Sequence, residues 1–157
     1  AEGGTITPAN SSSISDGASA LLLASEEATA AHGLTPRARI VAHARNSLAP
    51  ESFTLAPIGA AEQVLAKACW TTADVDLWEI NEAFAMVTML TTRALSLDPA
   101  CVNVHGGACA QGHPVGSTGS RIIVTLINAL EHYGRKRGIA SLCIGGGEAT
   151  AMAIELV

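Results

Sequence analysis

Apolar residues along the chain follow two patterns, short continuous runs and longer stretches with helical spacing. The short runs predict strands, and they cover residues 18–24, 40–44, 77–80, 102–104, 139–144 and 149–157. The run at 18–24 is bounded by Asp16-Gly17 on one side and Ser25 on the other. A near-continuous apolar run of this kind is typical of a strand that is buried on both faces.

Stretches with apolar residues three or four positions apart predict helices. One runs from Ser25 to Gly33, a second starts at Pro57, a third covers 84–95, and the most amphipathic one begins at 119 or 120 and closes at Tyr133. Ser25 is a typical helix cap, and proline is favoured in the first turn of a helix.

Strands and helices alternate along the chain, and the glycine run 145–147 joins the last two strands into a hairpin. This order predicts an α/β layered domain with a largely parallel sheet and helices on its faces. A length of 157 residues fits one such domain.

Composition narrows the class of function. The chain is 48% hydrophobic but only 3% aromatic, which suits closely packed helices on a sheet and does not suit a base-stacking platform. The net charge of −5 also argues against a nucleic-acid partner. Because no apolar stretch is long enough to span a bilayer and no signal peptide is visible, we expect no membrane association and a cytoplasmic location.

The four cysteines lack any Cys-x-x-Cys spacing, so we expect free thiols in a reducing compartment and no bound metal. The sequence begins at Ala1 rather than at a methionine. We therefore expect a processed chain, a trimmed chain or a piece of a longer one.

Three polar clusters lie at the C-terminal end of a predicted strand or in the loop after it, where open α/β sheets place their ligands. They are Asn81-Glu82, Gly112-His113-Pro114, and Cys143 with the glycines after it. Each also fits a structural role: Asn81 as a helix cap, His113 as a surface loop residue and Cys143 as a buried core thiol. Together they can supply a base or oxyanion donor, an acid and a group that orients water.

Glycines around these residues allow backbone N–H groups to approach a substrate closely. The stretch from Gly106 to Gly119 matches neither the P-loop nor the dinucleotide-binding signature, which makes a phosphate cradle the weaker interpretation.

Three motifs, in this order and spacing, resemble the C-terminal half of the thiolases: NEAFA at 81–85, GGACAQGHP at 106–114 and CIGGG at 143–147. The opening residues 4–18 are similar to the segment that leads into that half. The resemblance implies a thiolase-like half of α/β class, with a five-stranded mixed sheet between helices. It divides the chain into a lead-in at 1–16, which carries pantetheine contacts, and a C-terminal domain at 17–157.

The resemblance also implies a role for each matching residue. Cys143 corresponds to the acid/base cysteine, and His113 to the histidine that activates the nucleophilic cysteine and donates to the thioester oxygen. Asn81 corresponds to the asparagine that holds a water in one oxyanion hole, and the Gly145 N–H to a donor of the second. Ser12 matches a pantetheine contact.

Phe84 matches an aromatic residue that lines the pocket of the thiolases. The implied reaction is acyl transfer between coenzyme A thioesters, with acetyl-CoA C-acetyltransfer as the narrower expectation. Coenzyme A enters as part of the substrates, and no separate cofactor is implied.

The family's nucleophilic cysteine has no counterpart here. Cys69 lies in a helix-and-loop context, Cys101 begins a predicted strand, and Cys109 stands where the family has an apolar residue, which favours packing. Ser13 and Gln111 also depart from the family pattern and border the expected pocket. We therefore expect the chain to be inactive alone and to need a thiolase N-terminal half, in cis or as a separate chain.

Such a half is expected to expose apolar surface and to form homo-oligomers. Two alternatives stay open. One is a non-catalytic module that binds acyl-CoA or serves in assembly, which the missing nucleophile favours. The other is a hydrolase in which Cys143 attacks a thioester with His113 as the base.

Overall fold

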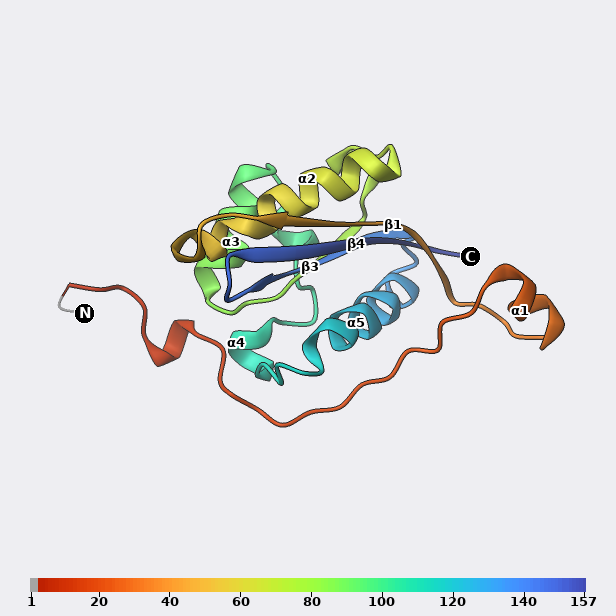
Figure 1. The fold of residues 1–157 in the computed structure, drawn as a ribbon, viewed down its shortest axis with the longest axis horizontal. Coiled ribbons are helices and arrows are strands. Elements are labelled where there is room, and N and C mark those ends of the chain that lie inside the picture. The colour runs from red at the N-terminus through yellow and green to blue at the C-terminus, as the bar shows by residue number, and fades with distance from the viewer. Residues whose placement is uncertain (1–2) are drawn as a thin grey trace.

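The computed structural model describes residues 3–157, and four strands among them form one sheet. These are β1 (Ala38–Ser47), β2 (Leu77–Ile80), β3 (Arg137–Ile144) and β4 (Glu148–Leu156), in the spatial order β1-β4-β3-β2 (Figure 1). Only β2 and β3 pair in parallel, while β4 is antiparallel to both of its neighbours. The expectation of a mixed sheet is confirmed, whereas five strands and a largely parallel arrangement are wrong.

Five α-helices connect and flank the strands: α1 (Glu26–Ala31), α2 (Ala56–Ala68), α3 (Ala85–Ala94), α4 (Ala108–Gln111) and α5 (Thr118–His132). Short 3₁₀ helices cover Pro8–Asn10, Pro50–Leu55, Thr72–Asp74 and Pro99–Cys101. The Ser25 hydroxyl caps α1 by accepting a hydrogen bond of 3.1 Å from the Ala28 N–H, as the sequence predicts. Within residues 3–157, no helix combines the length and the apolar content needed to cross a bilayer.

Helices cover both faces of the sheet, which confirms the predicted layering (Figure 1). On one face α2 packs Val64 and Leu65 into a core with Trp78 and Ile139. On the other face the apolar stripe of α5 packs against the opposite side of the sheet. That second core contains Leu77, Ile122, Leu126, Leu130 and Ile154. Alternate residues of β2 therefore face α2 and α5 in turn.

The strand predicted at 18–24 is not formed. This segment is extended, but no strand of the described residues lies beside it, and the side chains of Leu22 and Leu23 are 83% and 71% exposed. In Figure 1 it is the orange stretch that runs outside α4 and α5 before α1. The apolar pattern predicts the extended backbone correctly, but burial requires a neighbouring sheet that residues 3–157 do not provide.

The strand predicted at 102–104 is reduced to a single bridge between Trp78 and Val102. The chain turns away at Asn103, which has a φ of 48°. The Asn103 side chain then takes the place of a strand, because it accepts from the Ile80 N–H at 2.8 Å and donates to the Ile80 carbonyl at 2.9 Å. The outer edge of β2 is thus paired by a side chain.

Candidate active site

Parallel pairing of β2 with β3 brings two of the expected site residues to one edge of the sheet. Asn81 follows the end of β2, and its N–H donates to the Ser141 carbonyl of β3 at 2.9 Å. Cys143 lies two residues further along β3, and the exposed Gly145 follows the end of that strand. Asn81, Cys143 and Gly145 therefore gather at the carboxyl ends of adjacent parallel strands, as the sequence predicts.

The Asn81 side chain is buried without any hydrogen-bond partner. The residue is 1% exposed, and neither Oδ1 nor Nδ2 is paired within the described structure. A buried amide left in this state costs free energy, so its polar atoms are free for a bound molecule. The simpler interpretation of Asn81 as a helix cap is wrong, because α3 begins at Ala85 and its cap position is Phe84.

His113 is fixed by a short hydrogen-bond chain. Its Nδ1 lies 2.7 Å from the Thr118 hydroxyl, which itself donates to the Pro114 carbonyl at 3.0 Å. Because that hydroxyl has one proton and gives it to Pro114, it must accept from an Nδ1–H, and the imidazole Nε2 then carries the lone pair. Burial, and secondarily the Arg121 charge, lowers the pKa of His113 and favours the neutral ring.

Cys143 is a buried thiol, 8% exposed, and burial raises its pKa. All four cysteines are free. No group of three or more histidine, cysteine or acidic side chains among residues 3–157 is arranged to hold a metal ion.

Glu82 anchors the glycine-rich loop, a role that the sequence did not reveal. Its carboxylate accepts from the Cys109 N–H at 3.1 Å, and the Cys109 thiol points to the Glu82 carbonyl at 4.0 Å. Burial and the neighbouring Glu82 raise the pKa of Cys109, which fits packing and not nucleophilic attack. Gln111 closes the same loop by donating to the carbonyls of His105 and Gly106 at 2.7 and 3.2 Å.

The lead-in segment contacts first the NEAFA motif and then the glycine-rich motif. The N–H and hydroxyl of Ser12 both donate to the Ala83 carbonyl, at 3.1 and 3.3 Å. The His113 N–H donates to the Ser13 carbonyl at 3.0 Å. Ser13 therefore supports His113 through its backbone, while its hydroxyl turns to that of Ser15 at 3.1 Å.

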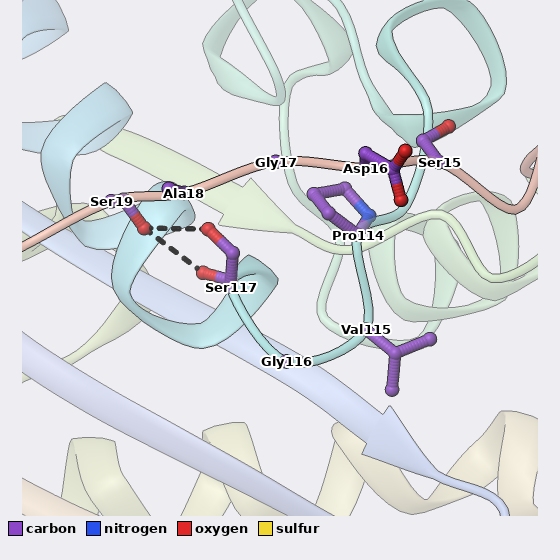
Figure 2. A pocket seen from close by; sticks show the side chains of 9 residues that line it. All are labelled: Ser15, Asp16, Gly17, Ala18, Ser19, Pro114, Val115, Gly116 and Ser117. Carbon is purple, nitrogen blue, oxygen red and sulfur yellow. Dashed lines mark hydrogen bonds between the residues drawn. The ribbon is translucent and has the colours of Figure 1, made fainter.

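A shallow cavity of about 380 Å³ lies where this segment meets the start of α5, between residues 15–19 and 114–117 (Figure 2). The Ser19 hydroxyl lies at one end of this cavity. The same hydroxyl is 2.8 Å from the Ser117 hydroxyl and 2.6 Å from the Ser120 hydroxyl. This serine cluster, Ser19 with Ser117 and Ser120, joins the lead-in to α5, and nothing in the sequence pattern indicates it.

Phe84 is half-buried and meets Phe53 edge to face, with ring centroids 6.2 Å apart. It packs against the core on the α2 face of the sheet. Its role as a pocket-lining residue stays a prediction.

Comparison with known proteins identifies the fold. Residues 34–156 match the family described as "Thiolase, C-terminal domain". The chain belongs to the thiolase family. Of solved structures, an acetyl-CoA acetyltransferase from Bacillus anthracis superposes with a TM-score of 0.94 at 43% identity, covering 97% of this chain and 39% of the other. The Acat5 thiolase from Ascaris suum in complex with coenzyme A gives 0.89 at 40%, covering 98% and 40%.

Curated thiolase relatives agree with the structures. Mouse cytosolic acetyl-CoA acetyltransferase is 47% identical over 97% of this chain and 38% of its own length. The Escherichia coli acetyl-CoA acetyltransferase is 45% identical over 97% and 39%. The chain thus spans about two fifths of these relatives. The thiolase C-terminal match begins at residue 34, so the extended 18–24 segment lies upstream of the matched domain.

Proposed function

We propose that this chain supplies the acid/base and oxyanion-hole half of a thiolase-type acyl-CoA acyltransferase that works on acetyl-CoA. The observation that carries the proposal is the buried, unpartnered Asn81 amide at the sheet edge that also holds Cys143. A buried polar group without a partner is costly unless a ligand uses it. The names of the mouse and Escherichia coli relatives support acetyl transfer as the reaction.

In the acetylation step that comes first, Cys143 gives its proton to the departing coenzyme A thiolate. In condensation, the resulting Cys143 thiolate removes a proton from the methyl group of acetyl-CoA. The C–H bond breaks, an S–H bond forms, and the electron pair moves to the thioester oxygen as an enolate. Burial raises the pKa of Cys143, so its thiolate is a stronger base for removing the methyl proton. For the same reason the thiol stays protonated until the reverse step, in which it donates that proton to carbon. A water held by Asn81 stabilises the enolate oxygen, together with the Nε2–H that His113 carries once it has taken the proton of the nucleophilic thiol.

The enolate carbon then attacks an acetyl group carried as a thioester on the partner half. A C–C bond forms, the C–S bond to the nucleophilic cysteine breaks, and the released thiolate takes back the proton that His113 Nε2 holds. With Nδ1–H turned toward Thr118, the Nε2 of His113 is the atom that takes the proton from the nucleophilic thiol. The Gly145 N–H, at the exposed turn after β3, donates to the oxyanion of the tetrahedral intermediate.

The partner in this proposal is a thiolase N-terminal half, in cis or as a separate polypeptide. None of the other cysteines suits the role of nucleophile: Cys69 ends α2, Cys101 ends a 3₁₀ helix, and Cys109 packs on Glu82. The extended 18–24 segment supplies the docking surface, because its leucines are exposed and its backbone is unpaired within the described residues.

The substrate is an acyl-CoA, and no further cofactor is proposed. In this proposal Ser12, which lies against the NEAFA loop, contacts the pantetheine arm, and Phe84 from the same loop lines the acyl pocket. The Ascaris suum thiolase, whose structure is a complex with coenzyme A, supports this ligand. We also propose a cytoplasmic location and a homo-oligomer of the completed enzyme.

A native mass spectrum of the protein purified from its source, before and after addition of acetyl-CoA, tests the proposal. We expect a second polypeptide in the complex that gains one acetyl group. The Cys143→Ala variant keeps the adduct but forms no acetoacetyl-CoA, while Cys109→Ala keeps both. A single species that binds coenzyme A without an adduct would establish the assembly module instead. Hydrolysis of acetyl-CoA by the chain alone, lost in Cys143→Ala, would establish the hydrolase.

A further inference from the structure

Asn81 and His113 differ in what holds their side chains. The His113 ring is bonded to the Thr118 hydroxyl, whereas both polar atoms of the Asn81 amide are unpaired within the described structure. Glu79, two residues earlier on β2, meets the Arg121 guanidinium of α5 at 3.8 Å, in an ion pair that does not involve Asn81. The direction of the Asn81 side chain therefore depends on the backbone that carries it, because backbone dihedral angles determine which rotamers are allowed.

The peptide bond between Ile80 and Asn81 is held from both edges of β2. On the inner edge, the Asn81 N–H donates to the Ser141 carbonyl of β3 at 2.9 Å. On the outer edge, the Ile80 carbonyl accepts from Asn103 Nδ2 at 2.9 Å, and the Ile80 N–H donates to Asn103 Oδ1 at 2.8 Å. The Thr88 hydroxyl of α3 reaches the same carbonyl at 3.4 Å, which is a longer contact.

The backbone of Asn103 is itself fixed, so its side chain has a firm base. Its N–H donates to the Trp78 carbonyl at 2.8 Å, and its carbonyl accepts from the Gly106 N–H at 2.8 Å, where the glycine-rich loop begins. Its φ of 48° lies in the left-handed region, which glycine and asparagine adopt more readily than other residues. Asparagine meets both demands of this position, because it allows the turn and supplies one donor and one acceptor to Ile80.

We propose that Asn103 is a positioning residue for Asn81 and that it acts through the peptide bond between Ile80 and Asn81. The importance of this position rests on the proposed function, in which the Asn81 amide holds a water beside the enolate oxygen. Without the Asn103 amide, the Ile80 carbonyl keeps only the longer contact from Thr88 among the described residues. The peptide bond is then less restrained, and the Asn81 side chain moves with it, since a site keeps its geometry through the residues that support it.

The test is NMR spectroscopy of the side-chain amides in the whole 157-residue chain. The two N–H signals of the Asn81 amide are identified by their absence from Asn81→Ala. Asn103→Gly is the main variant, because it allows the left-handed turn and removes both hydrogen bonds to Ile80. We expect the Asn81 signals to shift and to broaden in this variant, because the amide samples more than one orientation.

Asp76→Ala is the matched control at the other end of β2. The Asp76 carboxylate accepts from the backbone N–H groups of Lys136 and Arg137 at 3.0 and 2.9 Å, so this variant also removes two hydrogen bonds from a side chain to the backbone. It is expected to lower the thermal unfolding temperature, as Asn103→Gly does, and to leave the Asn81 signals in place. Loss of stability alone therefore does not reproduce the expected signature.

Asn103→Asp provides a milder variant if the glycine variant does not fold. Its carboxylate can still accept from the Ile80 N–H but has no N–H to donate to the carbonyl, so the Asn81 signals are expected to change here as well. Unchanged Asn81 signals in the folded Asn103 variants would overturn the proposal. Equal changes in Asp76→Ala would also overturn it.

Condensation in the complex with the partner half tests the proposed function separately. Asn103→Gly is expected to lower kcat by about 10- to 100-fold and to leave the KM for acetyl-CoA unchanged, because a positioning residue acts on geometry and not on binding. Slow condensation in Asn81→Ala with a normal kcat in Asn103→Gly would overturn the proposal. A normal kcat in both variants would contradict the role proposed for Asn81, while the NMR signals still decide whether Asn103 positions it.

Discussion

Glu82 fills the space beside Gly107 so closely that a Cβ at position 107 would overlap the Glu82 carboxyl group. The same carboxylate accepts the Cys109 N–H two residues later. The glycine-rich loop is therefore shaped by the residue that follows Asn81, and the two motifs form one unit.

Replacement of Gly107 by alanine is expected to displace Glu82 and to lower the free energy of unfolding by about 1–3 kcal/mol, the usual cost of overpacking. Denaturant unfolding measures the change. Gly119→Ala is the matched control, since nothing lies within 4 Å of its Cβ position and it is helical. That change is expected to stabilise the chain by about 0.5–1 kcal/mol. Equal effects from the two alanines would contradict the packing argument.

Asn81 and Asn103 are predicted to respond in opposite ways to alanine. Asn103 makes two hydrogen bonds to Ile80, so Asn103→Ala is expected to cost about 1–3 kcal/mol of stability. Asn81 makes none with its side chain, so Asn81→Ala leaves the unfolding transition nearly in place. In the complex with the partner half, however, Asn81→Ala is expected to slow acetoacetyl-CoA formation by roughly 10²–10³-fold.

Those two variants are compared by thermal unfolding and by the rate of condensation. A large loss of stability in Asn81→Ala with an unchanged rate would make Asn81 a structural residue.

Thr118 is predicted to select the tautomer of His113. Thr118→Val keeps the shape of the side chain but removes the hydroxyl, so the proton is expected to distribute between Nδ1 and Nε2. Thr118→Ser keeps the hydroxyl and the Nδ1–H form. Nitrogen chemical shifts of the ring distinguish the forms directly. A valine variant with the same ring signals as the unmodified chain would show that Thr118 does not set the tautomer.

Glu79 is predicted to make the chain less stable as the pH rises from about 4.5 to 7. Burial raises its pKa from 4.5 to about 7, so over this range the unfolded chain releases a proton that the folded chain keeps. The stabilisation is complete below the lower value and lost above the higher one. A shift of this size corresponds to about 3 kcal/mol.

Denaturant unfolding at several pH values compares the unmodified chain with Glu79→Gln, in which this fall is expected to be absent. Glu131→Gln serves as a comparison, because the pH dependence that Glu131 contributes to stability has the opposite sign. The Arg37 guanidinium lowers the pKa of Glu131, so its contribution is present above the unfolded value and lost as the pH falls. Parallel curves for the unmodified chain and Glu79→Gln would refute the assignment.

The exposed leucines of the 18–24 segment are predicted to serve assembly and not the stability of this chain. Leu22→Lys combined with Leu23→Lys is expected to leave the unfolding transition unchanged, because both side chains are exposed. The same change is expected to prevent association with the partner half, as seen by native mass spectrometry. An intact complex in the double variant would exclude this segment as the docking surface.

The sequence predicts correctly those elements that are determined by residues close together in the chain. Leu77–Ile80 forms the predicted strand because its run is bounded on both sides, and Ser25 caps α1 because the cap is a contact within one turn. The strand predicted at 18–24 is wrong because burial depends on a neighbour that the pattern cannot supply. The motifs singled out Asn81, His113 and Cys143; in the structure Asn81 follows the end of β2, Cys143 lies near the end of β3, and His113 follows α4.

The side-chain contacts that hold the site motifs in place could not be predicted from the sequence. Glu82 meets Cys109 across 27 positions, and Asn103 meets Ile80 across 23. The Arg121 partner of Glu79 was likewise invisible, because its spacing along the chain depends on how α5 lies on the sheet. Contacts of this kind depend on the tertiary arrangement, which no periodicity in the sequence records.

The serine cluster has a consequence for the order of folding. Ser19 and Ser117 are 98 positions apart, so the loop that their contact closes contains most of the chain. Closing so long a loop carries a large entropic cost, and such contacts form after local helices and hairpins have reduced the span. During synthesis the lead-in therefore waits, exposed, until the residues around His113 and the start of α5 have left the ribosome.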